Sequence, residues 1–178
     1  MTEHLKSLVR TIPDFPEPGI MFRDVTTLFA DPAGMAGSIR GMVDHAGAFP
    51  KFDCVAGIEA RGFILGAALA IELGVGFVPL RKKGKLPGAT LHEDYALEYG
   101  TDTLEVHQDA INEGDRVLLI DDLIATGGTA LAAHRLVTRA GGIVPAAFFV
   151  IDLPELGGAA KLRAAGLEVR VLMDFDGA

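Results

Sequence analysis

The sequence Val117-Leu118-Leu119-Ile120-Asp121-Asp122-Leu123-Ile124-Ala125-Thr126-Gly127-Gly128-Thr129 contains an apolar, an acidic and a small, hydroxylated part. Its first four residues form an unbroken apolar run, which is typical of a strand buried on both faces of a parallel sheet. Two carboxylates, Asp121 and Asp122, follow at the carboxyl end of this strand, where open α/β sheets hold their ligands. A helical pattern comes next, and its apolar face consists of Ala130, Ala133, Val137 and Ala140. The stretch therefore predicts a strand, a turn and a helix of an α/β protein.

The turn in this stretch has the chemistry of a phosphate cradle. Two glycines allow the backbone to fold tightly and expose successive N–H groups. The start of the helix adds unsatisfied donors and partial positive charge, and two threonines add hydroxyl donors. The neighbouring carboxylates repel phosphate and suit ribose hydroxyls or a metal instead. We therefore expect a ribose 5-phosphate here, with its phosphate on Ala125, Thr126, Gly127, Gly128 and Thr129.

An acidic strand end and a Gly-Gly turn also occur in proteins without any ligand. The whole thirteen-residue string, however, resembles the signature of the type I phosphoribosyltransferases, which bind 5-phosphoribosyl 1-pyrophosphate (PRPP). This resemblance implies a single α/β domain over residues 1–178, with a mostly parallel sheet flanked by helices. It further implies an N-terminal arm and base-binding hood in residues 1–32 and a mobile β-hairpin flap in residues 81–107. The signature alone does not identify the base.

The composition favours a globular cytoplasmic protein. The chain has 178 residues, of which 49% are apolar, and a mean hydropathy of +0.33. Its longest uncharged apolar run, Phe63 to Ile71, is too short to span a bilayer, and Cys54 is the only cysteine. The net charge of −8 argues against a nucleic-acid partner. The same charge means that local cations or Mg²⁺ must attract a polyphosphate ligand.

Two charged segments follow predicted strands, Cys54–Ile58 and Val75–Leu80. The second segment, residues 81–85, holds four of the 16 basic residues of the chain. A charge run is usually a solvated face, but at the end of a core strand we favour a polyphosphate clamp. The resemblance implies that a pyrophosphate loop with a cis peptide is formed by Glu59, Ala60 and Arg61. It also assigns the pyrophosphate to Arg81, Lys82 and Lys85.

The segment Pro18-Gly19-Ile20-Met21-Phe22-Arg23-Asp24 resembles the hood of the adenine-specific branch of this family. A helix over Thr2–Ile12 is expected before it, and the prolines around it exclude regular structure. The resemblance implies that Phe22 stacks on adenine and that the backbones of Met21 and Arg23 read its edge, with Leu153 on the other side of the ring. A structural alternative for the Arg23 side chain is an ion pair with Asp24 or another acid.

The string Leu97-Glu98-Tyr99-Gly100 also matches the adenine-specific branch. By its pattern alone, it is a hairpin with an exposed acid. Because few core residues are expected in the two arms, we predict a mobile flap. The resemblance implies that Glu98 is an acid or base and that Tyr99 packs beside it.

Five motifs between Pro13 and Leu153 thus predict an enzyme that converts adenine and PRPP to AMP and pyrophosphate. The resemblance gives Asp121 and Asp122 catalytic roles at the ribose, brings Mg²⁺ mainly through PRPP, and implies a homodimer without membrane or nucleic-acid partners. The scattered histidines show no metal-ligand spacing. Two alternatives stay open: an enzyme of the same fold acting on hypoxanthine, guanine, xanthine or orotate, and a non-catalytic PRPP-sensing regulator.

Overall fold

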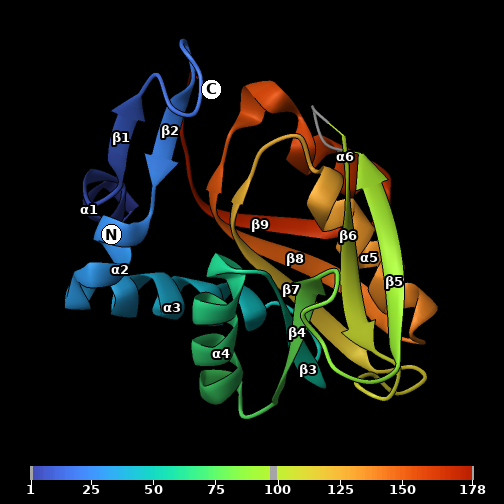
Figure 1. The fold of residues 1–178 in the computed structure, drawn as a ribbon. Helices are drawn as coiled ribbons and strands as arrows, with labels where there is room; N and C mark the ends of the chain where they lie inside the picture. The colour runs from blue at the N-terminus through green and yellow to red at the C-terminus, as the bar shows by residue number, and fades with distance from the viewer. Residues whose placement is uncertain (1, 97–99, 178) are drawn as a thin grey trace.

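A seven-stranded sheet organises the chain in the computed structural model, which describes residues 2–96 and 100–177 (Figure 1). Across the sheet, the strands are β5 (Thr90–Ala96), β6 (Thr101–His107), β4 (Gly76–Lys82), β3 (Cys54–Ile58), β7 (Arg116–Ile124), β8 (Ile143–Asp152) and β9 (Glu168–Asp174). The five strands from β4 to β9 run parallel, whereas β6 and β5 are antiparallel additions beyond β4. The predicted α/β architecture with a mostly parallel sheet is confirmed.

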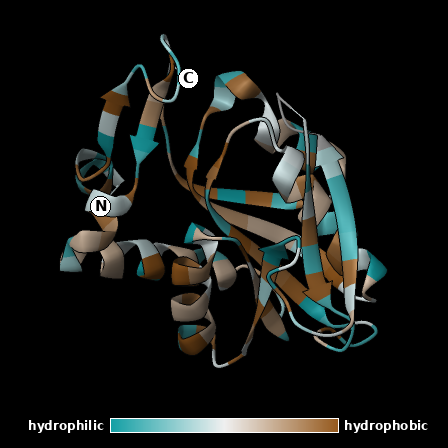
Figure 2. Cartoon of the chain, viewed as in Figure 1, coloured by the Kyte–Doolittle hydropathy of each residue, from teal (hydrophilic) through white to brown (hydrophobic). Residues whose placement is uncertain are grey.

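Helices cover both faces of the sheet. On one face lie α1 (Thr2–Ser7), α2 (Thr26–Ala30), α3 (Pro32–Ala46) and α4 (Arg61–Leu73). On the other lie α5 (Gly128–Arg139) and α6 (Gly158–Ala164), the latter preceded by the short 3₁₀ helix η1 (Pro154–Leu156). Figure 2 shows apolar residues concentrated in the central strands, while β5 at the edge is largely hydrophilic.

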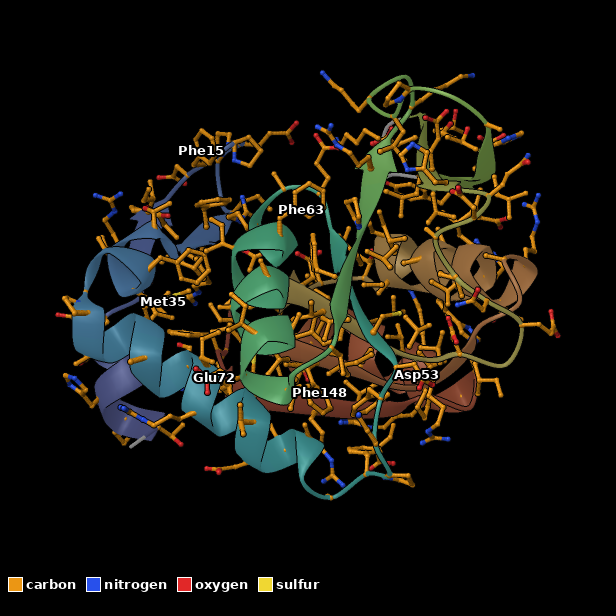
Figure 3. The ribbon with its side chains drawn as sticks, turned by 90° about the horizontal axis from the view of Figure 1, so that it is seen from below. Phe15, Met35, Asp53, Phe63, Glu72 and Phe148 are labelled. Carbon is orange, nitrogen blue, oxygen red and sulfur yellow. The ribbon has the colours of Figure 1, made fainter. Side chains whose placement is uncertain are left out.

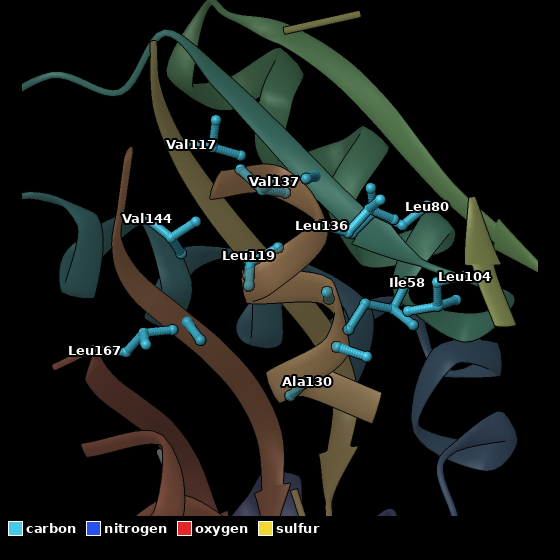
Figure 4. Packing of buried hydrophobic residues seen from close by; sticks show 14 of the residues in the cluster. Ile58, Leu80, Leu104, Val117, Leu119, Ala130, Leu136, Val137, Val144 and Leu167 are labelled. Atoms are coloured by element: carbon cyan, nitrogen blue, oxygen red, sulfur yellow. The ribbon is translucent and has the colours of Figure 1, made fainter. Parts of the chain in front are cut away.

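The apolar run of β7 supplies both cores, because successive side chains of a strand point to opposite faces. Val117 and Leu119 belong to the cluster that contains α5, and Leu118 and Ile120 belong to the cluster that contains α4. Figure 4 shows the first of these clusters, with side chains of α5 packed over the strands. All four residues are at most 1% exposed, which explains why the run has no polar member.

The sheet opens beside β7. The pairing of β3 with β7 ends at Gly57 opposite Ile120, whereas the pairing of β7 with β8 continues to Ile124 opposite Asp152. The sequence suggested that Asp121 and Asp122 follow the end of the strand. The structure instead places both residues within β7. They occupy the part of the strand that has lost one of its two neighbours.

The predicted helix Thr2–Ile12 is wrong beyond Ser7. Residues Arg10–Pro13 form β1, which pairs antiparallel with β2 (Met21–Asp24) in a separate two-stranded sheet. The apolar spacing near Ile12 fits a helix, but pairing with β2, a partner distant in sequence, decides the local structure. Figure 1 shows this hairpin beside the main sheet, near the C-terminal end of the chain.

The expectation that the flap arms carry few core residues is also wrong. Tyr95, Leu104 and Val106 are buried in the cluster that contains α5. From α5, Arg135 donates a 2.5 Å hydrogen bond to Glu93 of β5, and Arg139 donates one of 2.9 Å to the same side chain. The arms are core strands because α5 covers them. Residues 97–99, including the predicted Glu98 and Tyr99, lie outside the described part of the chain.

Asp24 joins the β1–β2 hairpin to α2 and should make the folding stability depend on pH. Its carboxylate is buried and accepts hydrogen bonds from the Thr26 N–H, at 2.9 Å, and from the Arg10 guanidinium. These bonds, that from Thr26 first, lower the pKa of Asp24 from 3.8 to about 2. Because the folded-state pKa is the lower one, the stabilisation is complete above about pH 4 and is lost as the pH falls towards 2.

We expect Asp24→Asn to lower the free energy of unfolding by about 2 kcal/mol at pH 7. Urea denaturation of both proteins between pH 2 and pH 7 would measure this difference, which should shrink below pH 4. Glu17→Gln, in an exposed loop position, serves as the control for loss of one negative charge. A difference that stays constant over the whole pH range would contradict this role of Asp24.

Candidate active site

Two cavities lie along the open part of β7 and share Asp121. The smaller cavity, of about 120 Å³, is lined by Asp121, Leu123, Ile124, Ala125, Thr126, Gly127, Gly128, Thr129, Ala130 and Phe149. The larger cavity, of about 310 Å³, is lined by Glu59, Ala60, Arg61, Lys82, Asp121 and Asp122. The structure thus brings together side chains that are up to 70 positions apart in sequence and that were predicted to bind one ligand.

The smaller cavity lies at the N-terminus of α5 and is lined by the residues that were predicted to form a phosphate cradle. Gly127 has a φ of +79°, which favours glycine, and caps the helix. The Gly158 N–H donates a 3.0 Å hydrogen bond to the Ala125 carbonyl, and the Lys161 ammonium donates one of 2.9 Å to the Thr126 carbonyl. Both carbonyl oxygens thus accept hydrogen bonds from other parts of the chain. The N–H groups of the turn and of the start of the helix remain available to bind an anion.

Gly158 was not predicted as part of the site, although Gly157-Gly158 is visible in the sequence. A Cβ at Gly158 would lie 2.3 Å from the Ala125 oxygen and 2.7 Å from the Gly127 nitrogen. No side chain fits at that distance, so α6 supports the cradle from behind by backbone contact. Only the three-dimensional approach of the two loops reveals this constraint.

Asp121 and Asp122 form a carboxyl pair with unequal surroundings. Burial, together with the charge of Asp122, raises the pKa of Asp121 well above its usual range, and the Asp122 N–H donates a 2.9 Å hydrogen bond to Asp121 Oδ1. Asp122 accepts a hydrogen bond from Arg61 Nε at 2.5 Å. Partial burial by itself would lower the pKa of the Arg61 guanidinium, but the neighbouring Asp122 carboxylate raises this pKa. Such a pair can accept hydrogen bonds from two adjacent hydroxyl groups.

Of the four cations predicted to form a clamp, Arg61 and Lys82 line the larger cavity, whereas Arg81 and Lys85 are not among its lining residues. The Glu59 carboxylate accepts hydrogen bonds from the Lys82 N–H at 2.9 Å and from Arg81 Nε at 3.3 Å. Burial alone would raise the pKa of Glu59, but these bonds lower it. Arg81 also donates a 3.1 Å hydrogen bond to the Lys85 carbonyl. The Glu59–Ala60 peptide is cis, as the resemblance implies.

Two further polar residues of this region were not predicted. The Lys82 ammonium lies 3.1 Å from Asp102 Oδ2, and the Tyr95 hydroxyl donates a 3.2 Å hydrogen bond to the same oxygen. No sequence motif marks Tyr95 or Asp102, because only the register of β5 and β6 places them opposite each other.

The predicted hood residues lie on the β1–β2 hairpin. Phe22 contacts Phe15 with ring centroids 5.1 Å apart and an interplanar angle of 76°. Phe15 was not predicted as a site residue; it is 51% exposed, and Figure 3 shows it at the edge of the molecule, away from the core residue Phe148. Met21, in the same strand, is partly buried. The two rings offer an apolar, partly exposed surface that suits a flat heterocycle.

The structural alternative for Arg23, an ion pair with Asp24 or another acid, is not found among the described residues. Asp24 pairs with Arg10, whereas the Arg23 guanidinium donates hydrogen bonds to Thr11 Oγ1 at 2.6 Å and to the carbonyls of residues 176 and 177 at 2.6 and 2.9 Å. It also lies 4.8 Å from the ring centre of Phe175. Adjacent residues in a strand point to opposite faces, which keeps the two side chains apart. The Arg23 side chain therefore fastens the hairpin to the C-terminal segment.

Leu153, predicted on the far side of the base, is buried directly after β8. Its N–H donates a 3.1 Å hydrogen bond to the Ile124 carbonyl, so it is fixed to the strand that leads into the cradle.

Among residues 2–96 and 100–177, no three His, Cys, Asp or Glu side chains are arranged to hold a metal ion. None of the helices in the same ranges is long and apolar enough to cross a membrane.

Residues 24–154 match the phosphoribosyl transferase domain family. The curated adenine phosphoribosyltransferase of Parvibaculum lavamentivorans is 61% identical over 97% of this chain and 98% of its own length. The crystal structure of adenine phosphoribosyltransferase from Thermoanaerobacter pseudethanolicus is 49% identical, has a TM-score of 0.92, and the match covers 98% of this chain and 100% of that one. The Trypanosoma brucei enzyme, solved with AMP, pyrophosphate and ribose-5-phosphate, is 28% identical with a TM-score of 0.87, over 98% of this chain and 79% of that one.

Proposed function

The chain belongs to the adenine phosphoribosyltransferase family, and we propose that its two cavities bind the two ends of PRPP. It is a pentosyltransferase of purine salvage that transfers the 5-phosphoribosyl group of PRPP to adenine, giving AMP and pyrophosphate. One observation carries the assignment of the cavities: they share Asp121, and one is lined by a helix N-terminus while the other contains the cations Arg61 and Lys82. A ribose with phosphate groups at its two ends has the matching pattern of charge.

In this arrangement, the 5-phosphate binds residues 125–129, and the ribose hydroxyls bind Asp121 and Asp122. Displacement at the ribose C1 passes through a state with oxocarbenium character, as in glycoside cleavage. The charged Asp122 lies where it stabilises the positive charge that develops on the ring. Catalysis by these residues therefore consists of positioning the ribose and complementing its charge.

The leaving pyrophosphate contacts Arg61, Arg81, Lys82 and Lys85. Three of these cations are paired with the carboxylates Asp122, Glu59 and Asp102, so in a chain whose net charge is −8 it is their ordered donor groups, together with Mg²⁺, that bind the anion. Glu59, Asp121 and Asp122 line the larger cavity, but in the described part of the chain no three such side chains are arranged to hold a metal ion, which fits Mg²⁺ that arrives with PRPP and is held largely by PRPP oxygens. When bound, Mg²⁺ neutralises charge on the departing pyrophosphate.

Adenine stacks on Phe22, with the backbones of Met21 and Arg23 at its edge and Leu153 on the opposite face. The apolar contact between Phe15 and Phe22 supports this placement, because it fixes the ring that stacks. Glu98 accepts or relays the proton that adenine N9 loses as it attacks C1, and Tyr99 packs beside it. Closure of the segment around them keeps water from hydrolysing PRPP.

Product analysis with separate bases tests the assignment. We expect the purified protein with PRPP and Mg²⁺ to form AMP from adenine, and no nucleotide from guanine or hypoxanthine. Chelation of Mg²⁺ should reduce the rate, and chromatography of the nucleotides measures both effects. Nucleotide from another base would overturn the hood assignment. Binding of PRPP without any turnover would favour the non-catalytic regulator instead.

Glu98→Ala should lower kcat by about 10²-fold while the KM for PRPP stays within about twofold, because general acid–base groups act on the rate and not on binding. Steady-state kinetics with adenine and PRPP varied in turn would separate the two constants. An unchanged kcat would remove Glu98 from the chemistry.

We further propose a cytoplasmic homodimer. A groove of about 740 Å³ between α3 and α4 is lined by apolar side chains that include Met35, Ile39 and Ile71, with Arg40 and Glu72 among its charged residues. Ile71 is 79% exposed, which is unusual for an isoleucine and supports a partner at this place. Charges of both signs within one groove suit a self-complementary interface.

Ile71→Lys should weaken self-association if this groove is the dimer interface, because a charge would be buried between two copies. Light scattering after size-exclusion chromatography would show a shift from the dimer mass to the 18.7 kDa monomer. The matched control is Ile143→Lys, at an exposed isoleucine at the start of β8. A monomeric parent protein, or equal behaviour of the two variants, would contradict the proposal.

A further inference from the structure

Three cations of the predicted pyrophosphate clamp each pair with a carboxylate. Only two of these three carboxylates line the larger cavity. Arg61 pairs with Asp122 and Arg81 pairs with Glu59, and both carboxylates line the larger cavity. Lys82 pairs with Asp102, which is not among the lining residues and comes from β6. Asp102 therefore contacts the cation without facing the space that the cation lines, so its contribution to the site must act through Lys82.

The Asp102 carboxylate is itself held in place from three sides. Its Oδ1 accepts a 2.8 Å hydrogen bond from the Thr103 N–H, and its Oδ2 accepts one of 3.2 Å from the Tyr95 hydroxyl. Lys82 Nζ lies 3.1 Å from the same Oδ2. Tyr95 is buried in the cluster beneath α5, so the chain of contacts ends in the rigid core. Figure 1 shows how β6 lies between β4, which carries Lys82, and β5, which carries Tyr95.

We propose that Asp102, supported by Tyr95, is a positioning residue that holds the Lys82 ammonium at the wall of the pyrophosphate cavity. The inference rests on the proposed role of Lys82 as a pyrophosphate ligand. An ammonium group has three donors, so a hydrogen bond to Asp102 leaves two for phosphate oxygens. The Lys82 side chain is 54% exposed and would otherwise sample many rotamers, which the ligand would have to order on binding.

Charge alone predicts the opposite effect, because the negative Asp102 repels pyrophosphate. Both of its oxygens are engaged, however, and the ion pair with Lys82 is neutral when seen from a distance. Salt screens the longer-range repulsion between Asp102 and pyrophosphate more strongly than the 3.1 Å contact between Asp102 and Lys82, because screening grows with distance. The positioning effect should therefore exceed the repulsion at physiological ionic strength.

Asp102→Asn is the decisive variant, because it keeps the size of the side chain and removes its charge. We expect the KM for PRPP and the Kd for pyrophosphate with Mg²⁺ each to rise about three- to tenfold. The kcat, the KM for adenine and the midpoint of thermal unfolding should change little. Tyr95→Phe should raise the same two constants by a smaller factor, since it removes one of the supports of Asp102.

Asp94→Asn is the matched control. Asp94 lies exposed in the same hairpin and accepts a 2.7 Å hydrogen bond from the Thr103 hydroxyl, so the variant removes one negative charge without changing a contact of Lys82. Its KM for PRPP should equal that of the parent enzyme. Equal increases in Asp94→Asn and Asp102→Asn, or a decrease in Asp102→Asn, would overturn the positioning role.

Lys82→Met separates this inference from the proposed function on which it rests. If Lys82 binds pyrophosphate, the single variant raises the KM for PRPP, and adding Asp102→Asn should then have no further effect. Failure of Lys82→Met to raise the KM would refute the role of Lys82 itself. If the KM for PRPP rises in Lys82→Met but does not change in Asp102→Asn alone, only the positioning role is refuted. If the effects of the two substitutions on this KM are additive in the double variant, Asp102 acts by a route other than Lys82, which also refutes the positioning role.

Discussion

The site depends on the place where β7 loses one of its two neighbours. Up to Ile120, the strand is paired on both sides, and its side chains enter two cores. Beyond Ile120 only β8 remains, so the backbone stays straight and ordered while one side opens. Asp121 and Asp122 fall in this half-paired part, which lets them be held rigidly and still face a ligand. Cavities at such positions follow from the geometry of open parallel sheets.

A second constraint is the control of charge within an acidic chain. Arg61, Arg81 and Lys82 are paired with Asp122, Glu59 and Asp102, so the positive charge of these three side chains is compensated before the substrate binds. These pairs order the cations and fix their directions. The carboxylates thus serve both the stability of the unliganded protein and the geometry of the clamp.

Local patterns in the sequence were sufficient where neighbouring residues decide the structure. The buried strand around Leu118, the turn at Gly127 and the helix that contains Ala130 and Val137 were predicted because an unbroken apolar run, a glycine pair and a helical apolar spacing mark them. The helix predicted up to Ile12 failed for the converse reason: its apolar spacing was compatible with a helix, and the partner strand that overrides this preference lies ten residues further along the chain.

The sequence by itself therefore determined the chemistry of this protein: a phosphate cradle, a carboxyl pair, a cluster of cations and the family whose motifs contain them. Tertiary structure alone decided which groups touch. The pairing of Lys82 with Asp102, the support of Ala125 by Gly158 and the attachment of Arg23 to residues 176–177 join positions far apart in the chain. Such contacts depend on strand register and on the packing of loops, and these are set by the whole fold and leave no local pattern in the sequence.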